Sequence, residues 1–198
     1  MKKIAILLTV LLMVSSVNVF SQDHYEQTKM QIQPALLVID IQNVYLSMVP
    51  ERDKEVAMYY INGLITLFRT HGYPVIRIYH HDQESGPQPG TELFEYPASV
   101  LIRDEDARVI KTYGNAFNKT DLDRLLRESG SNTLFLCGLS AVGCVLATWI
   151  GAQDQDYKAF MVKDAIMSHH SGYTDQIEDM FDAVGYDVVK LLLENSGK

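Results

Sequence analysis

The stretch Leu134–Ala152, LFLCGLSAVGCVLATWIGA, contains both cysteines of the chain and joins two kinds of local structure. Its first half is a short apolar run around Cys137, which predicts a buried strand. After the small residues at 140–143, the apolar spacing from Cys144 onward predicts a helix. A cysteine within a strand and one at the start of the next helix do not face each other at bonding distance. We therefore expect two free thiols.

Other apolar runs share the composition of this strand, because they are rich in Val, Ile and Leu and do not alternate cleanly. Such runs are typical of strands buried on both faces of a parallel sheet. With helical patterns between most of them, they predict a three-layer α/β/α fold around a central, mostly parallel six-stranded sheet. The expected strands are Pro34–Ile41, Tyr73–His81, Ala107–Thr112, Asn132–Leu139, Tyr157–Ala165 and Tyr186–Leu191, and the expected helices are Glu51–His71, Thr120–Ser129, Gly143–Asp154 and Thr174–Val184.

One long segment, Asp82–Asp106, interrupts this alternation. It contains three prolines and two glycines and shows no long hydrophobic periodicity. We expect an extended surface loop, and a loop of this length in a compact domain is often functional.

The first 21 residues have the layout of a secretory signal peptide, with Lys2 and Lys3 before the apolar run Ile4–Val14 and small, polar residues after it. A retained anchor is the alternative, but this run is shorter than the roughly 20 residues that a spanning helix needs. We expect a signal peptide over 1–21 and one domain over 22–198, exported to the periplasm or secreted, without a stable membrane anchor after cleavage. The net charge of −8 argues against nucleic acid as a partner, because no basic stripe is present to neutralise phosphates.

Three reactive side chains lie at the carboxyl ends of predicted strands: Asp40 closes the first, Lys111 closes the third, and Cys144 follows the loop after the fourth. Singly, each has a structural explanation, as a capping residue, a solvated lysine or a small apolar side chain. Because ligands collect at the carboxyl ends of parallel strands, we expect the three to meet there. A helix start and a nearby cation favour the thiolate of Cys144, and Asp40 could accept the thiol proton and return it to a leaving amine.

The chain resembles the isochorismatase-like cysteine hydrolases, which include nicotinamidases and N-carbamoylsarcosine amidases, from about Ala35 to Lys190. The matching segments are LLVIDIQN with Asp40 and Gln42, VIKTYGNAFNKTDLDRLL with Lys111 and Phe117, the stretch around Cys144, and MVKDAIMS with Asp164. The resemblance implies a catalytic triad of Asp40, Lys111 and Cys144. It also implies a cis peptide between Leu139 and Ser140, an oxyanion hole formed by the backbone N–H groups of Ser140 and Cys144, and a homo-oligomer.

The chain departs from the metal site of nicotinamidases, which an aspartate and histidines form near the second strand. RIYHHDQESG offers His80 and His81 without an Asp-x-His order, with Asp53 and Asp82 as the possible substitutes. We therefore expect neither a metal ion nor an organic cofactor. Gln42, His81 and Phe117 are the candidate substrate-binding residues. We expect Trp149 to pack against the sheet or a neighbouring subunit, and His169 and His170 to be loop or subunit-contact residues.

The resemblance implies that isochorismatases proper usually lack this cysteine, because hydrolysis of a vinyl ether needs no attack by a thiol. The presence of Cys144 therefore favours acyl chemistry at an amide-like carbon. The sequence therefore predicts a hydrolase that cleaves a small amide or related C–N substrate through a thioester on Cys144. One alternative is non-covalent hydrolysis of the isochorismatase type, which uses Asp40 alone. Another is a non-catalytic binding or assembly protein that kept the fold.

Overall fold

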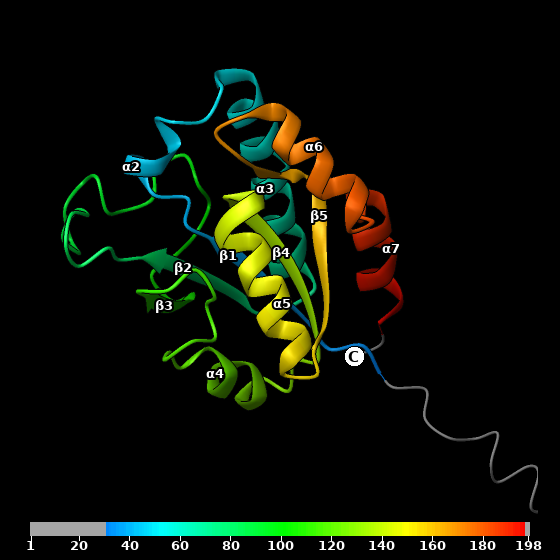
Figure 1. Ribbon diagram of the computed structural model, residues 1–198. Helices are drawn as coiled ribbons and strands as arrows, with labels where there is room; N and C mark the ends of the chain where they lie inside the picture. The colour runs from blue at the N-terminus through cyan, green and yellow to red at the C-terminus, as the bar shows by residue number, and fades with distance from the viewer. Residues whose placement is uncertain (1–30, 197–198) are drawn as a thin grey trace, which may run out of the picture. The chain divides into compact units, whose positions relative to one another are not determined.

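The fold is built on a sheet of five parallel strands, seen in a computed structural model that describes residues 31–196 (Figure 1). The predicted signal peptide, residues 1–21, lies outside the described residues. The strand order is β3-β2-β1-β4-β5, so the chain runs outward from β1 in both directions and leaves a crevice beyond the carboxyl ends of β1 and β4. The strands are β1 (Pro34–Ile39), β2 (Val75–His80), β3 (Ala107–Lys111), β4 (Thr133–Leu139) and β5 (Lys158–Met167).

Helices cover both faces of this sheet, as the three-layer prediction requires. The helices are α2 (Asn43–Leu46), α3 (Glu51–Thr70), α4 (Leu122–Glu128), the π-helical turn η1 (Ala141–Val145), α5 (Leu146–Asp154), α6 (Ser171–Met180) and α7 (Tyr186–Asn195). Alternate residues of β1 enter two separate cores: Leu36 and Val38 pack with α3 and α7, whereas Leu37 and Ile39 pack with α4, η1 and α5.

The sixth predicted strand, Tyr186–Leu191, is wrong, because these residues lie in α7. Val189 and Leu193 are the buried residues of this helix and lie four positions apart, which is helical spacing. A short apolar run does not by itself distinguish a strand from a helix. Only Val184 pairs with the sheet here, through a single parallel bridge to Val162.

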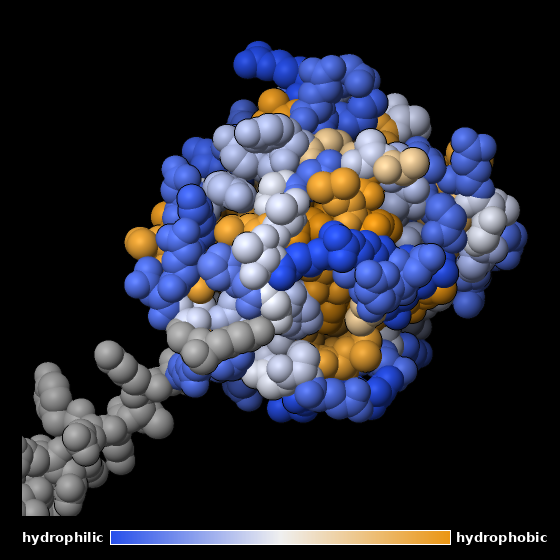
Figure 2. Space-filling view, turned by 180° about the vertical axis from the view of Figure 1, so that it is seen from behind, coloured by the Kyte–Doolittle hydropathy of each residue, from blue (hydrophilic) through white to orange (hydrophobic). Residues whose placement is uncertain are grey.

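The helix α7 also carries an exposed apolar side, since Val188 and Leu191 are 47% and 60% exposed. The side of the molecule opposite to Figure 1 shows apolar residues between hydrophilic ones (Figure 2).

The homo-oligomer that the resemblance implies stays a prediction. Within residues 31–196, no helix is both long and apolar enough to cross a bilayer.

The connection between β2 and β3 is a long loop, as predicted, and part of it belongs to the core. Phe94, Tyr96 and Val100 are buried, and Tyr79 stacks on Phe94 with ring centroids 5.4 Å apart. The Tyr96 hydroxyl lies 2.8 Å from the carbonyl oxygen of Val38. The second half of the loop is therefore anchored to the sheet.

Candidate active site

The carboxyl end of the sheet brings Asp40, Lys111 and Cys144 together. Asp40 directly follows β1 and has a φ of 52°, Lys111 is the last residue of β3, and Cys144 lies in η1 after β4. Since β2 separates β1 from β3, the Lys111 side chain reaches Asp40 past His80, its register partner on β2. The expected convergence at one sheet edge is what the geometry shows.

Asp40 and Lys111 form a buried ion pair. Lys111 Nζ donates to Asp40 Oδ2 at 2.8 Å, and the two residues are 1% and 3% exposed. Lys111 Nζ also lies 3.3 Å from Nδ1 of His80. The other carboxylate oxygen, Asp40 Oδ1, has no hydrogen-bond partner of ordinary geometry among the described residues. That oxygen is the open acceptor of the site.

Cys144 stands on an irregular first turn of the helix after β4. Ser140 has an extended backbone, and Gly143 has non-helical backbone angles, with a φ of −123° and a ψ of −109°. The N–H group of Val145 donates a hydrogen bond to the Ser140 carbonyl at 3.1 Å. The Leu139–Ser140 peptide is cis, as the resemblance implied. Gly143 N–H also donates to the Ser140 carbonyl, at 2.9 Å, so Cys144 lies between the two donors that close this turn. The first N–H groups of a helix have no intrahelical acceptor. Such groups can bind a developing oxyanion.

The segment after Lys111 is fixed to the helix after Cys144. Ala116 N–H donates to the buried hydroxyl of Thr148 in α5 at 3.1 Å. A Cβ atom on Gly151 would collide with the side-chain amide of Asn115, so this amide lies directly against the Gly151 backbone. These contacts hold the Lys111 and Cys144 elements in one arrangement.

The ionisation of the site favours a neutral thiol at rest. Burial raises the pKa of Cys144 to about 12, and the negative charge of Asp40 adds to this effect while Lys111 opposes it. Burial also raises the pKa of Asp40, against the opposing effect of Lys111. We expected Lys111 to favour the thiolate, but the desolvation of Cys144 outweighs the effect of this cation. Deprotonation of Cys144 therefore requires a base, and Asp40 is adjacent.

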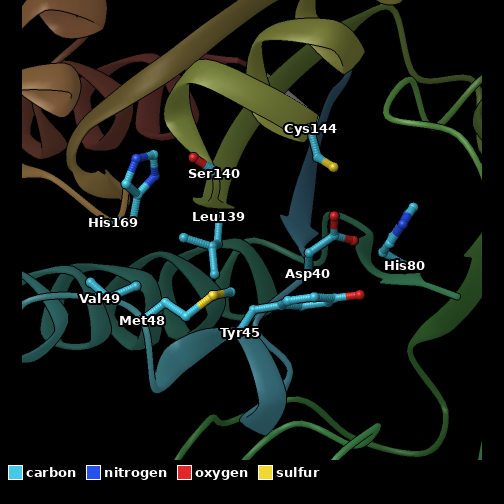
Figure 3. A pocket seen from close by; sticks show the side chains of 9 residues that line it. All are labelled: Asp40, Tyr45, Met48, Val49, His80, Leu139, Ser140, Cys144 and His169. Carbon is cyan, nitrogen blue, oxygen red and sulfur yellow. The ribbon is translucent and has the colours of Figure 1, made fainter. Parts of the chain in front are cut away.

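A cavity of about 190 Å³ opens directly onto these groups (Figure 3). In Figure 3 the sulfur of Cys144 and the carboxylate of Asp40 face each other across the pocket, with His80 beside them. A carboxylate oxygen of Asp40, a ring nitrogen of His80 and the Sγ atom of Cys144 all lie within 4.8 Å of one another. The lining residues are Asp40, Tyr45, Met48, Val49, His80, Leu139, Ser140, Cys144 and His169.

A family model described as "Isochorismatase domain" matches residues 34–189. The chain belongs to the isochorismatase family. The isochorismatase family protein YrdC of Bacillus subtilis is 26% identical to it over 157 residues, which cover 78% of this chain and 83% of YrdC. The family membership expected from the Asp40, Lys111 and Cys144 segments is thereby confirmed.

Solved structures of the family share this fold. An isochorismatase family protein from Burkholderia thailandensis matches with a TM-score of 0.71 at 23% identity, over 82% of this chain and 96% of that one. N-carbamoylsarcosine amidase from Thermoplasma acidophilum matches with a TM-score of 0.66 at 23% identity, over 78% of this chain and 95% of that one. At these identities the likeness shows the fold.

The three predicted substrate-binding residues do not line the pocket of this isochorismatase-family chain. The side chain of Gln42 is buried and bonds both backbone groups of His80, at 2.7 and 3.0 Å, so it positions the end of β2. His81 packs edge-on against Phe94, since successive residues of an extended chain point to opposite sides. Phe117 packs against Tyr157 in the core beside α5.

The sequence reasoning missed most of the pocket wall. Tyr45, Met48 and Val49 come from α2 and the turn after it, and α2 has only four residues, too few for a periodic signal. His169 lines the pocket after β5, whereas His170 caps α6 by accepting the Gly172 N–H. Trp149 packs on Phe181 and donates to the Ala159 carbonyl, in agreement with the packing role expected for it.

The donor set of this isochorismatase-family site fits a metal ion poorly. Asp40, His80 and Cys144 offer ligand atoms close together, but the Lys111 ammonium lies against two of the three. A divalent cation there would face a buried positive charge and compete for its partners. Asp82, a suggested substitute ligand, instead accepts hydrogen bonds from Ser85 and Glu84 in its own turn.

Proposed function

We propose that this isochorismatase-family hydrolase cleaves a small amide or related C–N substrate through a thioester on Cys144. The observation that carries the proposal is the placement of the Cys144 thiol beside Asp40, whose other oxygen is fixed by Lys111. A nucleophile, a base and a residue that orients the base therefore share one small pocket. The structural likeness to N-carbamoylsarcosine amidase supports C–N chemistry.

In the acylation step, Asp40 takes the thiol proton as the sulfur bonds to the substrate carbonyl carbon. The carbonyl oxygen becomes an oxyanion and accepts from the N–H groups of Ser140 and Cys144. The proton on Asp40 then passes to the substrate nitrogen, the C–N bond breaks, and ammonia or an amine leaves. Since the thiol is protonated at rest, proton transfer accompanies attack.

In the deacylation step, Asp40 takes a proton from a water molecule, which attacks the thioester carbon. The C–S bond breaks, the acid product leaves, and the sulfur takes the proton back from Asp40. Lys111 keeps the Asp40 carboxylate in place through both steps and balances its charge when it is ionised. The pair thus returns to its starting state after each turnover.

Ammonia release from a panel of small primary amides tests the proposal, together with acid quenching and mass measurement of the Cys144 peptide. We expect an acyl adduct on Cys144 and at least about a thousandfold loss of kcat in Cys144→Ala. Cys137→Ala is the matched control, because Cys137 is a buried strand residue whose thiol lies near the Leu37 carbonyl, and it should retain turnover. Full turnover by Cys144→Ala with none by Asp40→Asn would instead establish the non-covalent alternative.

A further inference from the structure

Apart from the catalytic groups and two histidines, His80 and His169, the pocket wall is mostly apolar. Tyr45, Met48, Val49 and Leu139 form the side facing Asp40 and Cys144 (Figure 3). No arginine and no lysine lines the cavity among residues 31–196. Lys111, which is bonded to Asp40 of the lining, is 1% exposed and already paired. Within the part of the chain that the structure describes, no lysine or arginine side chain therefore offers a positive charge to a ligand in this cavity.

The remaining titratable groups at the wall give no strong anion site either. His80 is half-buried, and burial together with the neighbouring Lys111 lowers its pKa, so it is neutral near pH 8. His169 is exposed to solvent at the pocket edge. The carboxylate of Asp40 faces the interior and would repel a second carboxylate. A substrate carboxylate would lose its water and gain no permanently charged partner from the lining residues, only polar groups such as the Tyr45 hydroxyl, which is costly.

The size of the cavity limits the substrate as well. About 190 Å³ is below the roughly 300–1,000 Å³ usual for small-molecule sites. The reacting carbonyl group must lie between Cys144 and Ser140, which leaves room for a short substituent against Tyr45 and Met48. Apolar contact is the interaction that this wall can supply.

We propose that the pocket selects neutral substrates with a compact apolar substituent and excludes carboxylate-bearing amides. This inference rests on the proposed function, since it takes Cys144 as the reacting group. It adds the charge and the polarity of the substrate, which the position of the catalytic residues does not determine.

Two alkylating agents of similar size test the charge selection without any turnover. Iodoacetamide is neutral and iodoacetate is anionic, and both alkylate a thiol by displacing iodide. We would measure both rates at Cys144 by peptide mass spectrometry at pH 8 and divide their ratio by the ratio for glutathione. We expect a preference for iodoacetamide at least about tenfold larger than that of glutathione, because a buried, unpaired charge is disfavoured. A ratio equal to or below that of glutathione would overturn the proposal.

A charge introduced at the wall provides the matched control. Met48 lines the pocket and is 58% exposed, so Met48→Lys can place an ammonium at the cavity without a buried charge, and Met48→Gln changes polarity alone. We expect Met48→Lys, but not Met48→Gln, to raise the iodoacetate rate by about tenfold relative to iodoacetamide. Equal effects of both variants would contradict charge selection.

Turnover separates this inference from the proposed function. We expect ammonia release from isobutyramide and little from succinamate, which has a carboxylate. The reverse preference would overturn the substrate class and leave the thioester mechanism standing. No release from any amide of the panel would overturn the proposed function, whereas the alkylation ratio would still decide the charge selection at Cys144.

Discussion

Lys111 Nζ lies 2.8 Å from Asp40 Oδ2 although the two residues stand at the ends of strands separated by a third. The pair is nearly inaccessible to solvent, so each charge depends on the other. Breaking such a pair leaves one charge buried and uncompensated.

Lys111→Met should therefore lower the free energy of unfolding by about 3–5 kcal/mol, as measured by urea denaturation. Lys190→Met is the matched control, because Lys190 is half-exposed and its contact with Glu194 is 3.9 Å long. Removing that exposed pair should cost less than about 1 kcal/mol. Similar losses in the two variants would show that the Asp40–Lys111 pair contributes nothing special to stability.

Asp40→Asn should change thiol reactivity and turnover in opposite directions. The Asp40 charge raises the pKa of Cys144, whereas Lys111 lowers it, so removing the carboxylate favours the thiolate. We expect faster iodoacetamide labelling of Cys144 at pH 8 and a loss of ammonia release, because the base is gone. Cys137 is fully buried and its pKa is raised by burial, so it should stay unlabelled as the internal control. Slower labelling of Cys144 would mean that Asp40 activates the resting thiol.

Gln42→Met should destabilise the fold by about 1–3 kcal/mol and lower kcat, because it leaves the N–H and C=O groups of His80 without their side-chain partners. His80 contacts Lys111, so a shifted β2 end would disturb the Asp40–Lys111 pair. Calorimetry and steady-state kinetics measure the two effects. Unchanged kcat in a destabilised variant would limit Gln42 to a structural role.

Gly138→Ala should prevent folding or destabilise the protein by more than about 4 kcal/mol. Gly138 has a φ of 117°, and a Cβ atom there would collide with the Ile39 carbonyl group. Gly130→Ala is the control, since its φ of 70° is also positive but its Cβ atom would meet nothing within 4 Å. That substitution should cost only about 1 kcal/mol, and equal costs would rule out the close strand contact as the cause.

Glu178→Gln should stabilise the protein more at pH 8 than at pH 4. Burial raises the pKa of Glu178 above 4.5, so its stabilising contribution is complete below pH 4.5 and is lost as the pH rises through the folded-state pKa. Glutamine keeps an acceptor for the Asp164 N–H, 2.7 Å away, without a charge. Urea midpoints at both pH values measure the effect, with exposed Glu128→Gln as the control. A larger gain at pH 4 would contradict the assignment.

The sequence was sufficient for five strands and for the meeting of Asp40, Lys111 and Cys144, because strand ends of a parallel sheet share one edge. It did not distinguish His80 from His81, since adjacent residues at a strand end point to opposite sides and a shift of one residue exchanges them. The residues of α7 were predicted to form a strand, because a short run of apolar residues fits the hydrophobic spacing of a strand and of a helix equally well. The resting state of Cys144 depends on desolvation, which a linear pattern does not contain.

The loop before β3 has one more consequence. Its residues Glu92, Leu93 and Glu95 accept hydrogen bonds from Asn43 and Val44 and thereby hold α2, which carries Tyr45. The proposed catalytic residues do not depend on this loop, because Asp40 follows β1, Lys111 ends β3 and Cys144 lies in η1. Insertions or deletions in the loop can therefore reshape the recognition wall while the reacting atoms keep their places. Related enzymes can therefore acquire different substrates through changes in this loop while they keep the same reaction.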